Sequence, residues 1–523
     1  MRLLEFCEDG TICFEDFRDD KVPPYAILSH TWLRDQDGKE LEPTYEDLIN
    51  GTGKEKLGYK KIQFCSKQAS NDGLRYFWVD SCCIDREMNA ELSQAIRSMF
   101  LWYRNATRCY VYLSDVSTRK RKRGYDETQG SWEQAFRRSK WFARGWTLQE
   151  LLAPQSVEFF SQECKRLGDR GSLREQIHEI TCIPLLALEG TPLSQFSVKE
   201  RFLWMEHRQT TSEEDKAYSL LGIFGVSLYP LYGEGVVRAY KRLQEEIDKL
   251  EKCKQALHLT DPRKDKERIE DGKGGLLAKS YLWILDHPDF KHWREDQQSH
   301  LLWIKGDPGK GKTMLLCGVI NELEKLGAET YQLSYFFCQA TDSRINNAVA
   351  VLRGLLSLLI EQQPSLISHI QKRYDVEGRN LFEDANAWVA LSDIFTNILL
   401  DSSLIRTYLI IDALDECKEG QLKLVDFIVQ KSSLPSRVKW IVSSRNWPPI
   451  EEQLDKAGNK VRLCLELNNE FVSASVNVYI QHKVNQLAQE KEFDEEIRGA
   501  ILSHLVSKAD NTFLWVALMY QFL

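Results

Sequence analysis

The chain has 523 residues, of which 43% are hydrophobic and 28% are charged. This length is too great for one ordinary hydrophobic core, so two or three domains are expected. The formal net charge of -8 gives no general reason to expect binding to nucleic acid, and we expect none.

Neither the start of the chain nor its interior carries an export or membrane signal. Residues 1–8 lack the long apolar core of a signal peptide. The longest apolar-rich run, residues 348–360, contains Arg353 and is too short to span a bilayer. The thirteen cysteines include no C-x-x-C pair and no zinc-ligand spacing. We therefore expect a cytoplasmic protein with reduced thiols and no membrane span.

The first half of the chain alternates strands with helices. Apolar runs at 25–32, 76–80 and 109–113 predict strands, and helical spacing at 60–70 and 91–103 predicts helices between them. This alternation indicates a parallel α/β sheet, whose sites lie beyond the carboxyl ends of the strands. The polar side chains at those ends are Ser29, His30, Asp80 and Asp115.

A charged insertion at residues 118–130 contains five consecutive basic residues, Arg119 to Arg123. Such a run is typical either of a nuclear-localisation or nucleic-acid patch or of a solvated loop. No aromatic residue is interleaved with it, so we favour the loop.

Residues 139–152 place Trp146 and Glu150 one helical turn apart. An indole beside a carboxylate forms an apolar wall, which raises the pKa of the carboxylate and suits it to acid–base or nucleophile-like work. The alternative is that Glu150 only caps or salt-bridges a surface helix. A Ser-His-Asp hydrolase is disfavoured, because no G-x-S-x-G elbow occurs.

Four separated motifs give residues 1–245 a resemblance to the HET domain of fungal heterokaryon incompatibility proteins. They lie, in the family's order, at 25–32, at 78–80 with 83–85, at 144–150, and in the block of 208–211, 214–222 and 231–235. The resemblance implies a cell-death effector that acts when non-self is detected at cell fusion.

HET domains are in turn similar to TIR domains, and this chain shares with them residues 27–30 and the spacing Trp146-x-x-x-Glu150-Leu151. In enzymatic TIR domains the matching glutamate cleaves the nicotinamide–ribose bond of NAD, through an oxocarbenium-like transition state that a carboxylate stabilises. The resemblance therefore implies NAD as a substrate, catalysis by Glu150 and a pocket lined by Trp146. Ser29, His30 and Asp80 are the further candidates for substrate contacts.

Residues 246–276 are dense in alternating charges and close on a glycine-rich stretch at 272–275. This composition predicts a solvated linker between two domains.

The second half opens with the sharpest motif in the chain. The apolar run 301–305 predicts a buried strand, the next eight residues match G-x-x-x-x-G-K-[ST], and a helical pattern follows. Glycines let successive N–H groups turn toward phosphate oxygens, Lys312 would reach the β- and γ-phosphates, and Thr313 would bind Mg²⁺. Such a loop reads phosphates and not the base, so ATP and GTP both remain open. The nucleotide-binding candidates are Gly306, Asp307, Pro308, Gly309, Lys310, Gly311, Lys312 and Thr313.

Two further predicted strands end in charged side chains. The strand at 408–412 ends in Asp412, which is placed to hold Mg²⁺ together with Thr313. Asp415 and Glu416 follow within one turn and are candidates for polarising the attacking water. The strand at 438–445 ends in Arg445, a candidate reader of the γ-phosphate, with a surface salt bridge as the alternative. Strands at 331–338 and 463–467 complete a predicted parallel five-stranded sheet.

Residues 306–313, 411–416 and 443–445 together resemble a NACHT NTPase of the STAND class, and 508–517 is typical of NACHT domains behind HET effectors. The resemblance implies slow nucleotide hydrolysis, homo-oligomerisation in the triphosphate state and an unidentified protein trigger. STAND proteins often continue into WD40 repeats, but no 40-residue repeat is present in this sequence.

We therefore expect an α/β chain with a TIR-like HET effector at 1–245, a charged linker at 246–276 and a NACHT P-loop NTPase at 277–523. The expected protein is an intracellular NOD-like signalling switch, controlled by ATP or GTP with Mg²⁺. It would drive cell death in vegetative incompatibility or fungal innate immunity, with NAD cleavage as a candidate output. Two alternatives remain: a non-enzymatic HET scaffold that recruits partners, and a constitutive NAD hydrolase with a structural nucleotide site.

Overall fold

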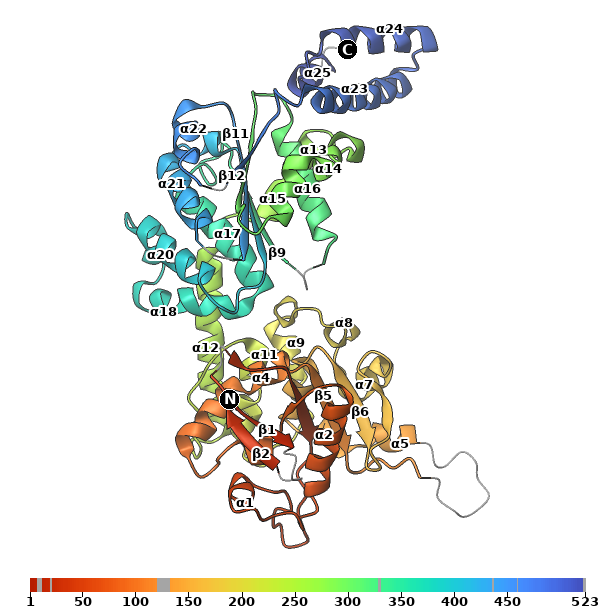
Figure 1. Ribbon diagram of the computed structural model, residues 1–523, viewed down its shortest axis with the longest axis vertical. Helices are drawn as coiled ribbons and strands as arrows, with labels where there is room; N and C mark the ends of the chain where they lie inside the picture. Colours follow the sequence, from red (N-terminus) through yellow and green to blue (C-terminus); the bar gives the residue numbers. More distant parts are fainter. Residues whose placement is uncertain are drawn as a thin grey trace. The chain divides into compact units, whose positions relative to one another are not determined.

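The computed structural model describes residues 1–6, 12–18, 21–119, 132–327, 331–434, 437–458 and 460–520. Most of the basic run at 119–123 lies outside these residues, so its prediction as a solvated loop stays a prediction. The chain divides into two compact units, Met1–Leu250 and Glu251–Leu523, each of which is described by itself (Figure 1).

The first unit is built on a mixed sheet of seven described strands in the order β2-β1-β4-β3-β5-β6-β7. The four central strands are parallel, as the alternating pattern predicted. Antiparallel strands flank them on both sides, and the sequence analysis did not predict these. The strands are β1 (Arg2–Phe6), β2 (Ile12–Asp16), β3 (Tyr25–His30), β4 (Tyr76–Trp78), β5 (Arg108–Leu113), β6 (Val157–Ser161) and β7 (Arg166–Asp169).

Helices cover both faces of this sheet, which leaves all six residues of the central strand β3 buried. Phe64 of α2 packs on Tyr110, Tyr112 and Phe160, so α2 lies on one face. The helices are α1 (Tyr45–Ile49), α2 (Tyr59–Asn71), α3 (Asp80–Cys83), α4 (Asn89–Asn105), α5 (Trp132–Arg137), α6 (Thr147–Leu152), α7 (Arg174–Thr181), α8 (Leu185–Leu188), α9 (Val198–Leu203), α10 (Asp215–Tyr218), α11 (Leu221–Phe224) and α12 (Val236–Leu257).

The second unit holds a five-stranded sheet in the order β12-β8-β11-β10-β9, and every pairing in it is parallel. The predicted parallel sheet is therefore confirmed. Its last strand begins three residues earlier than expected, because Lys460 and Arg462 alternate with the apolar residues of this edge strand and mask its start. The strands are β8 (Leu301–Lys305), β9 (Gln332–Phe337), β10 (Thr407–Asp412), β11 (Val438–Ser444) and β12 (Lys460–Cys464).

Helices α13 to α16 cover one face of this sheet, and α17, α20 and α21 cover the other (Figure 1). The core between them is apolar and contains Phe290, Trp293 and Leu302. The helices are α13 (Pro262–Gly272), α14 (Trp283–Asp286), α15 (Pro288–Glu295), α16 (Lys312–Glu324), α17 (Ala348–Gln362), α18 (Ser368–Glu377), α19 (Asn380–Glu383), α20 (Ala387–Leu399), α21 (Gln421–Ser432), α22 (Pro448–Leu454), α23 (Asn469–Lys491), α24 (Glu495–Lys508) and α25 (Phe513–Tyr520).

The segment predicted as a solvated linker, 246–276, is largely helical, and this expectation was wrong. It contains the end of α12 and all of α13. Ile269 enters the core of the second unit, and Lys266 donates to Asn321 at 2.6 Å and pairs with Glu270 at 2.9 Å. The charges misled the prediction because they pair along the helix while apolar side chains, among them Leu250, Leu257 and Ile269, and the stem of Lys266 pack inward.

Two sequence expectations concern the environment of the protein. None of the helices in the described residues combines the length and the apolar character that crossing a membrane requires. In the part of the chain that the structure describes, eleven cysteines are free thiols and Cys13 takes part in a disulfide, so the expectation of reduced thiols throughout was wrong.

Candidate functional site

The loop at residues 306–311 connects β8 to the first turn of α16 and has the shape of an anion cradle. Gly309 and Gly311 adopt φ values of 80° and 83°, a region that side-chain-bearing residues rarely enter. α16 begins at Lys312, so its free N–H groups and its positive dipole end face the loop. The arrangement can bind a phosphate group.

The side chain of Lys312 is folded back onto its own loop. Its ammonium donates to the carbonyl of Gly306 and, at 3.1 Å, to that of Asp307. Burial lowers the pKa of Lys312, while the nearby carboxylates of Asp415 and Asp412 act in the opposite direction. Phosphate oxygens would be stronger acceptors than two neutral carbonyls, so the lysine would exchange its partners for a phosphate group placed in the loop.

Asp412 ends β10 and is almost completely buried. The hydroxyl of Ser443, at the end of the adjacent strand β11, donates to Asp412 Oδ1 at 2.5 Å and accepts from the N–H of Ala413 at 2.9 Å. Ala413 has a φ of 54°, and this strained bend redirects the chain directly after the carboxylate. The sequence analysis missed Ser443 as a site residue, although two serines at the end of a largely apolar strand were a usable signal.

Two residues that were assigned separate roles are partners of each other. The guanidinium of Arg445 pairs with Asp415 Oδ2 at 2.9 Å, and its backbone N–H donates to Asp415 Oδ1 at 2.9 Å. Arg445 also lies 3.7 Å from Glu416, whose other oxygen accepts from the N–H of Ala340. The proposed water-polarising carboxylates are therefore held by the proposed phosphate reader.

The donor set fits a nucleotide–Mg²⁺ complex better than a metal held by protein alone. Within the described residues, no group of three or more His, Cys, Asp or Glu side chains could hold a metal ion. Mg²⁺ keeps several waters and usually takes one or two protein oxygens together with phosphate oxygens. Thr313 and Asp412 supply two protein oxygens of the required kind.

A turn from far down the chain packs on the phosphate loop. The N–H of Phe513 donates to the carbonyl of Gly309 at 2.9 Å, and Lys310 donates to the carbonyl of Asp510 at 3.2 Å. A Cβ at Gly309 would lie 2.8 Å from Leu514, and one at Gly311 would lie 2.8 Å from the Phe513 ring. Both glycines are therefore needed for close packing as well as for their backbone conformation.

In the first unit, Glu150 lies in α6 with only 6% of its surface exposed. The hydroxyl of Ser29, in β3, donates to Glu150 Oε2 at 2.5 Å, and the indole of Trp141 donates to Ser29 Oγ at 2.8 Å. The structure thus brings the predicted residues Ser29 and Glu150 together, and adds Trp141, which the sequence analysis did not consider.

Burial raises the pKa of Glu150 to about 8. The hydrogen bond from Ser29 opposes this shift, and the negative charge of Asp80 adds to it. A carboxyl group that titrates near neutral pH, on a buried helix, is characteristic of acid–base sites. The alternative of a surface cap or surface salt bridge is wrong, because the side chain is buried.

His30 and Asp80 belong to a second polar cluster. His30 Nε2 lies 3.7 Å from both Glu42 Oε2 and Asp80 Oδ1, and burial lowers the pKa of His30 to about 3, so the ring is neutral. Lys61 of α2 forms a buried ion pair with Glu42, and Trp32 donates to Asp80 Oδ2 at 2.9 Å. The sequence analysis missed Glu42 and Lys61, which lie outside the motifs that it used.

Trp146 does not provide the indole that is linked to Glu150. It is partly buried at the start of α6, and its side chain forms a hydrogen bond with Asp215. Gly145, beside it, allows close approach of the 208–211 block: its N–H donates to the carbonyl of Gln209 at 2.9 Å, and a Cβ would lie 2.4 Å from Thr210. Two motifs that are separated in sequence therefore meet beside Glu150.

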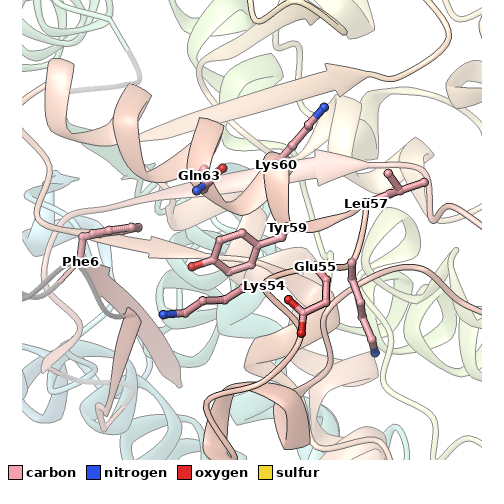
Figure 2. Close-up of a pocket in the computed structure, with 8 residues that line it drawn as sticks. Phe6, Lys54, Glu55, Leu57, Tyr59, Lys60 and Gln63 are labelled. Atoms are coloured by element: carbon pink, nitrogen blue, oxygen red, sulfur yellow. The ribbon is translucent and has the colours of Figure 1, made fainter.

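A surface cavity of about 540 Å³ on the first unit has a different lining (Figure 2). Lys54, Lys60 and Tyr59 border it, together with Phe6 and Glu55. None of the predicted site residues of this unit lines it.

Two family models match separate parts of the chain. The heterokaryon incompatibility protein (HET) family matches residues 25–129, and the NACHT-like family described as Nephrocystin 3, N-terminal, matches residues 279–445. Among solved structures, a chain from "Structure of Drosophila ORC bound to DNA" shows 13% identity over 50% of this chain and 67% of its own, with a TM-score of 0.23, which is too low to support an argument.

A curated relative extends these matches along the whole chain. "Vegetative incompatibility protein HET-E-1" from Podospora anserina is 56% identical over 522 residues, which is 100% of this chain and 38% of that protein. The chain thus spans less than half the length of this relative. The predicted combination of a HET region followed by a NACHT-like region is confirmed, and the chain is similar along its whole length to a heterokaryon incompatibility protein.

Proposed function

We propose that this protein is a nucleotide-controlled signalling switch that acts in the cytoplasm. The second unit would bind ATP or GTP with Mg²⁺, hydrolyse it slowly and form homo-oligomers in the triphosphate state. Clustered HET units would then cause cell death in vegetative incompatibility or fungal innate immunity, in response to an unidentified protein trigger. The observation that carries this proposal is the convergence of the phosphate loop, Asp412 and Arg445 at the carboxyl ends of the adjacent strands β8, β10 and β11.

The residues of the second unit have distinct roles in this proposal. Lys312 would leave the carbonyls of Gly306 and Asp307 for the β- and γ-phosphates. Thr313 and Asp412 would hold Mg²⁺, which bridges phosphate oxygens and neutralises their charge. Asp415 would orient the attacking water once its partner Arg445 turns to the γ-phosphate.

The turn at 510–514 supports coupling between nucleotide state and conformation. It contacts the phosphate loop through the carbonyl of Gly309 and through Lys310, so a movement of the loop changes the position of α25. A switch requires an element whose contacts differ between the nucleotide-bound and the nucleotide-free state. The turn at 510–514 is placed to be such an element.

The Lys312→Ala variant tests the switch. Nucleotide affinity is expected to fall at least about 100-fold, because the variant loses a charge-assisted contact to two phosphates. Titration calorimetry measures the affinity, and light scattering with and without nucleotide measures assembly. Lys325→Ala removes an exposed lysine at the end of the same helix, paired with Glu322, and is expected to leave both unchanged. Assembly that persists in Lys312→Ala without bound nucleotide would contradict the switch.

A second candidate function, NAD cleavage by the first unit, is favoured by one observation, the buried Glu150 whose pKa lies near 8. Breaking the nicotinamide–ribose bond releases nicotinamide as a neutral leaving group and leaves positive charge on the ribose. An ionised Glu150 would stabilise that charge, and water would complete the hydrolysis.

The Glu150→Gln variant tests this candidate. NAD turnover, measured as nicotinamide release, is expected to fall at least about 100-fold, because the amide carries no charge. Glu179→Gln, an exposed substitution in α7 at a carboxylate paired with Arg137, serves as the control. Equal turnover in Glu150→Gln and wild type would remove Glu150 from the mechanism. Absence of turnover in clustered wild-type protein would favour the non-enzymatic scaffold, and turnover unaffected by Lys312→Ala would favour the constitutive hydrolase.

A further inference from the structure

We propose that Trp141 is a positioning residue for Glu150: acting through Ser29, it confines the proton of the Glu150 carboxyl group to Oε1. The catalytic meaning of this assignment rests on the proposed NAD cleavage, but the assignment itself follows from counting hydrogen-bond donors and acceptors in a closed, buried chain of side chains.

The first step concerns Trp141. An indole N–H can donate but cannot accept, and Trp141 donates to Ser29 Oγ at 2.8 Å. Both residues are fully buried, so water cannot replace either partner. The edge-to-face contacts of the Trp141 ring with Phe142 and Phe159 hold the indole in this orientation.

The second step concerns Ser29. Its oxygen already accepts from Trp141, and its single hydroxyl proton is directed to Glu150 Oε2 at 2.5 Å. The Ser29 oxygen has a second lone pair, but Glu150 Oε2 is the acceptor that its hydroxyl proton reaches within the described residues, so Glu150 Oε2 acts as an acceptor. When Glu150 is protonated, its proton therefore lies on Oε1.

The third step concerns Tyr103 of α4, which forms a hydrogen bond with Glu150 that lowers the pKa of Glu150 when Tyr103 donates to the ionised carboxylate. The Tyr103 hydroxyl donates to the carbonyl of Leu28 at 3.1 Å. With its proton used there, Tyr103 can meet a protonated Glu150 as an acceptor. Every hydrogen bond in the series from Trp141 through Ser29, Glu150 and Tyr103 to the carbonyl of Leu28 then has one donor and one acceptor, and all of them run in the same direction.

The charged and titratable groups around Glu150 come from every element packed against it. Asp80 from α3 raises the pKa of Glu150, whereas Arg144, which precedes α6, lowers it. Glu150 in turn raises the pKa of Cys109 in β5, and it acts upward on the pKa of the buried Arg208. A neutral Glu150 with its proton on Oε1 would donate that proton to Tyr103, and it would become the carboxylate that the proposed NAD cleavage requires only after losing that one proton.

The test is an infrared titration of the full chain. The stretching band of a protonated carboxyl group is followed from pH 5 to pH 10, and Glu150→Gln identifies the Glu150 band by its loss. Wild type is expected to titrate near pH 8. Ser29→Ala is expected to raise the midpoint by about one unit, since it removes a hydrogen bond to the ionised form. Trp141→Phe is expected to raise it by less, and the double variant should match Ser29→Ala alone.

This equality separates positioning from a merely structural role, because an effect of Trp141 that is transmitted through Ser29 disappears once Ser29 is absent. Ser29→Thr keeps the hydroxyl and is expected to keep the wild-type midpoint, and it replaces Trp141→Phe in the test if that variant does not fold. Trp440→Phe is the matched control, since Trp440 is buried and its indole N–H has no hydrogen-bond partner within the described residues.

An unchanged midpoint in Trp141→Phe, or additive shifts in the double variant, would overturn the proposal. So would a Glu150 that is ionised throughout the pH range. The titration needs no NAD, so its result can be interpreted even if the protein does not cleave NAD. The role of Trp141 and the cleavage of NAD are therefore tested independently.

Discussion

The Lys61→Met variant is expected to lose about 3–5 kcal/mol of the free energy of unfolding of the first unit. Lys61 and Glu42 form an ion pair whose side chains are only 2% and 1% exposed. Lys61 also donates to the carbonyl of Thr31 at 2.8 Å. Methionine fills the same volume but leaves the charge of Glu42 buried without its cation. Chemical denaturation, with hydrogen exchange of peptides from β3 and α2, measures the loss in this unit.

Lys56→Met provides the control at a neighbouring lysine. Lys56 pairs with Asp47, but their side chains are 31% and 17% exposed, so the expected loss is about 0–1 kcal/mol. The double variant Lys61→Met with Glu42→Leu is expected to recover most of the stability, because no uncompensated charge remains. Equal losses in Lys61→Met and Lys56→Met would show that burial does not set the strength of the first pair.

Glu150→Gln is expected to unfold less readily than the wild type at neutral pH. Burial raises the pKa of Glu150 from 4.5 to about 8, so folding favours the protonated acid. The stability contributed by Glu150 is complete below pH 4.5 and is lost as the pH rises toward 8. Each pH unit in that window lowers the free energy of unfolding of the wild type by about 1.4 kcal/mol, which amounts to about 3 kcal/mol at pH 7. The variant has no carboxyl group at this position and does not undergo this loss. Denaturation curves between pH 4 and pH 9 measure the difference.

Glu163→Gln supplies a control of opposite sign. Burial alone would raise the pKa of Glu163, but hydrogen bonds from Ser117, Thr118 and Ser161 lower it to about 2. Its contribution to stability is present above pH 4.5 and is lost as the pH falls toward 2, so this variant should be less stable than wild type at pH 7. A Glu150→Gln variant that is less stable than wild type at pH 7 would contradict the conclusion that the buried Glu150 lowers the stability of the folded state at this pH.

The shape of the candidate nucleotide site was largely predictable, because its defining residues are contiguous. The strand β8, the loop at 306–311 and the start of α16 follow one another without interruption, which is the order that the glycine pattern predicted. The pairing of Arg445 with Asp415 and the support of Asp412 by Ser443 were not predictable, since strand order decides which strand ends become neighbours.

The candidate site residues of the first unit were predicted as one set, and the structure separates them into two clusters. Adjacent residues on a strand point to opposite faces, so Ser29 meets Trp141 and Glu150, whereas His30 meets Glu42 and Asp80. The alternation of the strand was sufficient to separate them. The identity of the partner indole was not available from helical spacing, because Trp141 precedes α6 in a separate 3₁₀ turn.

The pairing of β8 has a consequence for the synthesis of the protein. Its neighbours β11 and β12 begin at Val438 and Lys460, so ribosomes must add more than a hundred residues after the phosphate loop before this apolar strand can be paired. At typical elongation rates the delay is on the order of ten seconds. During that time the apolar residues Leu301, Leu302, Trp303 and Ile304 lack the strands that bury them, so aggregation is favoured when translation stalls or a gene fragment ends early.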